Sequence, residues 1–194
     1  MRNPKQERAI LKKEKIIDAG FKLICENGYY NINTATIAKE AGVSTGIVYQ
    51  YFNDKHDILI EGLKKYGNDI FFPMLKNNNL NFKFDNFEKL LKNMIENYIN
   101  NHKISKIAHE EIMAMVHSDP EIAEFYYKNE IEMTNKIKRL LIHNNFKDNN
   151  LEEKTHIMIN LIDDLCHEVI YHKHDDMNYD IMKKLVIETI IKLF

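Results

Sequence analysis

The segment between Thr34 and Lys55 holds the residues of this sequence whose types and spacing could do chemistry. It reads TATIAKEAGVSTGIVYQYFNDK, two short stretches of helical spacing separated by a glycine-bearing turn. Hydroxyl groups and an ammonium group at helix N-termini are suited to phosphate oxygens, and a glycine lets backbone approach a groove floor closely. This pattern predicts noncovalent recognition of nucleic acid.

Signatures of catalysis are missing from the sequence, which holds no GxSxG, GxGxxG, GxxxxGK or HExxH motif. His109 and Glu110 place a base beside an acid, yet neighbouring helical residues point about 100° apart and cannot act together on one atom. His102 would share a helix face with His109 only if one continuous helix contained both. We therefore expect no enzyme, no catalytic residue, no cofactor and no metal site.

Apolar residues recur every three to four positions along the chain, which indicates an all-α protein. Asn27-Gly28 reads as the end of one helix, and Asp119-Pro120 as the start of another. Nine helices are expected, at about residues 5–26, 34–40, 45–51, 54–76, 85–102, 103–117, 120–144, 151–173 and 178–193.

The two short helices after Thr34 are too short to be stable alone, so a scaffold must hold them. Apolar residues that recur through the segment form a seam suited to pack on the first helix: Ile37, Ala38, Ala41, Val43, Val48 and Phe52. That seam frees Thr45, Gly46, Ile47, Tyr49, Gln50 and Tyr51 to project. The pattern predicts a helix-turn-helix whose second helix enters the major groove, although helical hairpins also occur as plain structure.

The stretch from Ile16 to Leu63 resembles the N-terminal domain of the tetracycline-repressor (TetR) family of bacterial regulators. The matching positions are Gly28-Tyr29, Ile37-Ala38, Ala41-Gly42-Val43-Ser44, Gly46, Val48-Tyr49, Tyr51-Phe52, Lys55 and Leu59. The resemblance implies a homodimer that binds a palindromic operator on double-stranded DNA, usually represses, and is released by a small-molecule effector.

The resemblance also assigns roles by position. Thr34, Tyr49, Tyr51 and Lys55 match positions that contact phosphate, whereas Thr45, Gly46 and Gln50 match positions that approach bases. Ile47 stands where the family often has a hydroxyl residue, so a polar contact is lost there. For Tyr49, packing in the core is the alternative.

The recognition helix contains no Arg or Lys from Thr45 to Tyr51, so it lacks the bidentate partner of guanine. Gln50 can pair with adenine, and Thr45 and Ile47 can pack on thymine methyl groups. We therefore predict an operator core rich in A·T pairs.

Charge is polarised along the chain. Residues 1–60 carry nine basic and seven acidic side chains, or +2, so the remaining residues carry −4 of the total of −2. Six of the nine bases lie between Arg2 and Lys15, as in an arm that follows a phosphate backbone. A solvated helix face would show the same charges.

We expect a helix-turn-helix DNA-binding domain over residues 1–53 and an effector-binding and dimerisation domain over residues 54–194, with residues 77–81 as the loop between the N-terminal module and the larger helical domain. The sequence shows no membrane span and no secretory signal, so a cytoplasmic protein is expected. The resemblance implies that it is bacterial and is associated with the nucleoid when bound to DNA.

Two apolar stripes near the C-terminus are candidates for the dimer interface, which would be a four-helix bundle between two copies. The stripe residues are Met158, Leu161, Leu165, Val169, Ile181, Leu185 and Thr189. An intramolecular core could use the same residues.

The middle of the chain is rich in aromatic and thioether side chains, which suit a pocket for a small apolar or amphipathic effector. The candidates are Phe71, Met94, Tyr98, His109, Met113, Phe125, Met133, Ile162 and Cys166. Plain core packing is the alternative for each of them.

Taken together, these features predict a ligand-responsive transcriptional regulator, most often a repressor. One alternative is a protein of the same fold that binds proteins as a coactivator and has little affinity for DNA. Another is a helical module that only stores a ligand, which would show no salt-dependent binding to DNA.

Overall fold

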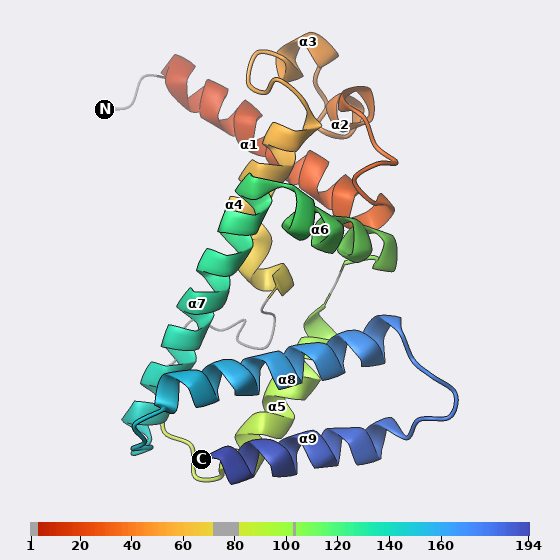
Figure 1. Ribbon diagram of the computed structural model, residues 1–194. Coiled ribbons are helices and arrows are strands. Elements are labelled where there is room, and N and C mark those ends of the chain that lie inside the picture. Colours follow the sequence, from red (N-terminus) through yellow and green to blue (C-terminus); the bar gives the residue numbers. More distant parts are fainter. Residues whose placement is uncertain (1–3, 72–81, 103) are drawn as a thin grey trace. The chain divides into compact units, whose positions relative to one another are not determined.

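The computed structural model describes residues 4–71, 82–102 and 104–194, and side chains within them except at residues 4–6 and 68–71. Over these ranges it contains nine helices and no strand, as the periodicity predicts (Figure 1). The helices are α1 Pro4–Asn27, α2 Thr34–Glu40, α3 Thr45–Val48, α4 Lys55–Phe71, α5 Phe87–Asn101, α6 Lys106–Ser118, α7 Pro120–His143, α8 Leu151–Tyr171 and α9 Tyr179–Leu193.

Several helix ends follow local signals in the sequence. Gly28 stops α1 in a left-handed conformation, with φ of 88°. Asp119 accepts hydrogen bonds from the backbone N–H groups of Glu121 (3.0 Å) and Ile122 (3.2 Å) at the start of α7. The caps expected for α1 and α7 are thereby confirmed.

Two helix boundaries differ from the expectation by three residues, and a third lies outside the described residues. Helix α3 ends at Val48 rather than Tyr51, because the chain continues in tighter turns, with Gln50 N–H on Ile47 (3.2 Å) and Tyr51 N–H on Val48 (3.0 Å). Helix α6 begins at Lys106 rather than 103, because Ser105 caps it. Helix α4 is described as far as Phe71, and its expected end near residue 76 and the loop 77–81 lie outside the described residues.

The chain divides into two compact units, Met1–Ile70 with Lys103–Tyr126, and Phe71–His102 with Tyr127–Phe194. In the first unit the core is centred on α1, α2 and α4, where Ile16, Ile37 and Ile58 are fully buried. Gly20 and Gly62 allow α1 and α4 to approach closely, because a Cβ atom at either position would strike Ile58 or Phe21.

The core of the second unit lies among α5, α8 and α9, and α8 and α9 run in opposite directions (Figure 1). Leu91, Ile159 and Ile190 are fully buried there. The hydroxyl group of Tyr98, also buried, donates to Asp163 (2.6 Å) and lies 2.8 Å from Nε2 of His167, so the core contains a satisfied polar cluster.

No helix in the described ranges has the length and apolar character that a membrane span needs. The expected boundary at residue 53, between a DNA-binding and an effector-binding domain, stays a prediction. The division of the chain into two compact units does not say what each unit does.

Candidate nucleic-acid interface

Helix α2 is held at its start by a reciprocal pair of hydrogen bonds. Oδ1 of Asn33 accepts from the backbone N–H of Thr36 (2.9 Å), and Oγ1 of Thr36 accepts from the backbone N–H of Asn33 (3.1 Å). Ser44 occupies the equivalent position before α3 but makes no such side-chain bond. The turn between the helices passes through Gly42, whose φ is 67°.

One side of this helix pair is buried and the other is open. Ile37, Ala38, Val48 and Phe52 are buried, as the apolar seam predicts, although Ala41 and Val43 are only half-buried. Among the projecting residues, Thr45, Gly46, Tyr49 and Gln50 are exposed, whereas Ile47 and Tyr51 are half-buried. The open side therefore presents Thr45, Tyr49 and Gln50, three polar residues that the sequence predicts to contact DNA.

Two residues with predicted phosphate contacts meet on this open side. Oγ1 of Thr34 and the hydroxyl of Tyr49 are hydrogen-bonded at 2.9 Å, which joins the start of α2 to the end of α3. The Tyr49 side chain is 58% exposed, so it does not serve the core. The hydroxyl group that accepts in this bond keeps its own proton, which it could donate to a phosphate oxygen.

Lys55 has a structural task in addition to its predicted one. Its ammonium group donates to the backbone carbonyls of Tyr29 (2.7 Å) and Ile32 (2.9 Å) and lies 4.3 Å from the centroid of the Tyr29 ring. Burial lowers the pKa of this group, although Glu111 opposes the shift. Two of its three protons thus hold the chain between α1 and α2, and a phosphate contact stays a prediction.

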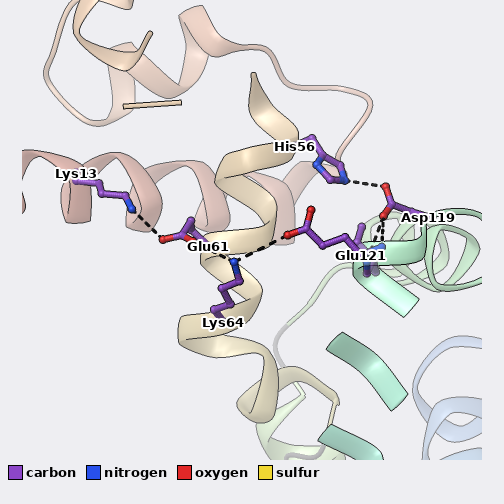
Figure 2. Close-up of polar contacts among 7 residues, drawn as sticks. Lys13, His56, Glu61, Lys64, Asp119 and Glu121 are labelled. Atoms are coloured by element: carbon purple, nitrogen blue, oxygen red, sulfur yellow. Dashed lines mark hydrogen bonds and ion pairs between the residues drawn. The ribbon is translucent and has the colours of Figure 1, made fainter. Parts of the chain in front are cut away.

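Further cations lie along α1. Arg8, Lys12 and Lys15 are exposed, while Lys13 pairs with Glu61 of α4 at 3.0 Å (Figure 2). The side chains of Arg2 and Lys5 lie outside the described residues. Exposed lysine and arginine side chains of this kind suit a phosphate backbone.

Helix α6 and the start of α7 belong to the same unit as the helix-turn-helix. The backbone N–H of Ser105 donates to the carbonyl of Cys25 (2.8 Å), and that of Tyr30 donates to Glu111 (3.2 Å). His56 of α4 is hydrogen-bonded to Asp119 at 2.7 Å (Figure 2). These supports were not foreseen, because the sequence marks Asp119 only as a helix cap and gives no sign that His56 is its partner.

The structure divides the candidate effector residues between the two units. His109, Met113 and Phe125 lie in the first, and the six others in the second. Met94, Tyr98, Met133, Ile162 and Cys166 are buried, and the side chain of Phe71 lies outside the described residues. Their role in effector binding stays a prediction.

His102 and His109 do not share a continuous helix, because α5 ends at Asn101 and α6 begins at Lys106. The face that could have held both imidazoles is therefore broken. The expectation of no metal site and no cofactor is left as it stands.

The candidate dimer residues separate into two groups. Met158, Leu165 and Val169 of α8 are buried within the single chain, as the alternative of an intramolecular core requires. Leu161 is half-buried, whereas Ile181, Leu185 and Thr189 of α9 are exposed. Among these candidates, the exposed apolar side chains are thus those of Ile181 and Leu185 on α9.

Comparison with known proteins adds a match in sequence. Residues 16–61 match the family described as bacterial regulatory proteins, tetR family. The HTH-type transcriptional regulator HbdR of Aromatoleum sp. (strain CIB) is 53% identical over 53 residues, 27% of this chain and 23% of that protein. The fatty acid metabolism regulator protein of Bacillus subtilis (strain 168) is 48% identical over 61 residues, 31% and 30% of the two chains. The chain thus spans less than a third of either relative, and both are named as regulators rather than enzymes.

Solved structures show that the likeness of fold extends beyond the matched segment. A Mesorhizobium loti protein assigned to the TetR-family regulators superimposes with a TM-score of 0.71 at 16% identity, covering 96% of both chains. A Saccharomonospora viridis transcriptional regulator, solved in complex with choline, gives 0.69 at 20% identity over 92% and 95%. The sequence match makes residues 16–61 similar to the tetR family of bacterial regulatory proteins, and the superpositions show that the fold is shared over nearly the whole chain.

Proposed function

We propose that this chain is a ligand-responsive transcriptional regulator that binds a palindromic operator as a homodimer, represses, and is released by a small apolar or amphipathic molecule. The observation that carries the proposal is the open side of α2 and α3, where Thr45, Gly46 and Gln50 are exposed while Val48 is fully buried. A buried seam below and a polar surface above are what a recognition helix needs in the major groove.

The contact roles follow the family's positions. Thr34, Tyr49, Tyr51 and Lys55 bind phosphate, and Thr45, Gly46, Ile47 and Gln50 lie against base edges. Since α3 and the turn after it carry no cation, the operator core is rich in A·T pairs and read by Gln50 and by apolar contacts to thymine.

The two domains have separate functions. Residues 1–53 bind DNA, residues 54–194 bind the effector and dimerise through α9 with the exposed edge of α8, and the protein acts in the cytoplasm on the nucleoid. The choline bound by the Saccharomonospora viridis regulator makes choline a suitable first probe of the effector site.

The test is binding of the full chain to the DNA immediately upstream of its own gene, measured at two salt concentrations. We expect tight binding that weakens steeply as salt rises, because lysine contacts to phosphate release counterions. Tyr49→Ala removes a predicted phosphate contact from the surface and is expected to weaken binding, whereas Tyr127→Ala, on an exposed tyrosine of α7, is the matched control.

Absence of binding at both salt concentrations would be followed by selection from random DNA. Recovery of a palindromic site would support the proposal. Failure to recover any site would overturn it and favour the coactivator, and a selected half-site centred on G·C pairs would overturn the A·T prediction.

A further inference from the structure

One carboxylate, that of Asp119, joins the starts of two helices in the first unit. Its Oδ1 accepts from the backbone N–H groups of Glu121 (3.0 Å) and Ile122 (3.2 Å), which caps α7. Its Oδ2 lies 2.7 Å from Nε2 of His56, in the first turn of α4 (Figure 2). The two oxygens of one side chain therefore tie α7 to α4.

Two carboxylates, those of Asp54 and Asp57, close the first turn of α4 from within. Oδ1 of Asp54 accepts from the backbone N–H groups of His56 (2.7 Å) and Asp57 (3.1 Å), and Asp57 accepts from the backbone N–H of Asn53 (2.7 Å). These bonds shape the turn but reach no other helix. The His56 side chain connects this turn to Asp119 through its hydrogen bond.

The bond between His56 and Asp119 is better shielded than the ion pairs around it. The two side chains are 26% and 24% exposed, whereas those of Lys64 and Glu121, whose charges lie 3.9 Å apart, are 55% and 58% exposed. Exposed pairs at that distance add little, because solvent screens them. Burial opposes ionisation of Asp119, but bonds from the backbone of Ile122 and from His56 outweigh it and lower its pKa.

The same turn of α4 also locates the recognition helix. Lys55, the neighbour of His56, is bonded to the carbonyls of Tyr29 and Ile32, and only residues 49–54 separate α3 from α4. Because this connection is short and Phe52 within it is buried, we expect a rotation of the first turn of α4 to be transmitted to α3.

We infer that Asp119 is a positioning residue for DNA binding, which fixes the first turn of α4 through His56 and so sets the angle at which α3 meets the operator. This inference rests on the proposed function. It goes beyond it by assigning a role in DNA binding to Asp119, a residue outside the helix-turn-helix.

The test separates the two tasks of Asp119. Asp119→Ser keeps a good helix cap but is too short to reach His56, and His56→Phe keeps a ring but removes the hydrogen bond. Binding of the full-length variants is measured on the operator selected from random DNA by the wild-type chain, with thermal unfolding measured in parallel.

Each single variant is expected to bind about tenfold more weakly, or about 1.4 kcal/mol, and the double variant no more weakly than either. The variants are also expected to discriminate less than wild type between this operator and one with a base pair inserted at its centre, because the angle of α3 is no longer fixed. Glu121→Gln, which breaks the exposed pair with Lys64, is the matched control and is expected to bind like wild type.

The inference would be overturned if Asp119→Ser bound the operator with the same affinity and the same spacing preference as the wild-type chain. The proposed function would then stay intact. Loss of thermal stability with unchanged operator affinity would overturn it as well, since the bond would then be only structural. Failure of the wild-type chain to select any DNA would instead overturn the proposed function.

Discussion

At the scale of single residues, polar side chains that the sequence marks for DNA contact also hold the domain together. Thr34 and Tyr49 are bonded to each other, and Lys55 is bonded to two backbone carbonyls. Residue type and position marked these side chains as candidates for DNA contact. They could not reveal these bonds, because the partners lie 15 to 26 residues away along the chain.

Gly28 and Gly42 provide a matched pair for a test of backbone strain. Both have positive φ, but only at Gly28 would a Cβ atom collide, at 2.7 Å from Ile107 and 2.8 Å from the Glu111 oxygen that accepts from Tyr30. Gly28→Ala is expected to destabilise the fold by about 2–4 kcal/mol and Gly42→Ala by about 1 kcal/mol. Urea unfolding measures both, and equal losses would show that the contact with α6 is unimportant.

The two cysteines are expected to be unreactive in the folded chain. Burial raises the pKa of both the Cys25 and the Cys166 thiol to about 12, with smaller contributions from Glu26 and Asp163 respectively. Alkylation by N-ethylmaleimide at pH 8 should therefore be slower than that of a free thiol by on the order of 100- to 1000-fold. Mass spectrometry with and without denaturant measures this, and fast labelling of the native chain would contradict it.

At the scale of elements, helix starts and stops followed from local chemistry, and most of them could be predicted. Asn33, Asp119 and Gly28 act as caps at or next to the expected places. The expected length of α3 was wrong, because periodicity does not distinguish a last α-helical turn from the tighter turns formed by Tyr49 to Tyr51.

The capping box of α2 is expected to matter more than the cap position of α3. Asn33→Ala removes a side-chain bond at the start of a helix of only seven residues and should lower stability by about 1 kcal/mol. Ser44→Ala should have little effect, because the Ser44 side chain makes no capping bond. Thermal unfolding of the two variants decides, and an equal loss in both would contradict the assignment.

At the scale of the whole molecule, the division of apolar faces between core and surface is what the sequence left open. Helices α8 and α9 both carry apolar stripes. Leu165 of α8 is 3% exposed, whereas Leu185 of α9 is 55% exposed. A dimer through these helices would therefore use α9 more than the sequence suggested.

Charged substitutions on the apolar stripes of α8 and α9 should have different consequences. Leu185→Asp is expected to give a folded monomer, because it places a charge in the proposed interface without disturbing the core. Leu165→Asp should instead unfold the chain, because an unpaired carboxylate would be buried. Ile142→Asp, at a residue of α7 that is 53% exposed, is the control and should leave the oligomeric state unchanged.

Sedimentation velocity reports the mass of each variant, and circular dichroism reports whether it is folded. A dimer that survives Leu185→Asp would contradict the proposed interface. A folded Leu165→Asp variant would contradict the burial of the α8 stripe.

The sequence by itself determined the all-α fold, most helix ends and the segment that carries the family's pattern. These depend on neighbours a few residues apart, such as the spacing of apolar residues, caps and turn glycines. Only the tertiary structure decided that Leu165 is buried while Leu185 is exposed, and that His56 meets Asp119. Helical periodicity gives each helix an apolar face but does not say which face it packs against, and polar groups 63 residues apart meet only once those faces have packed.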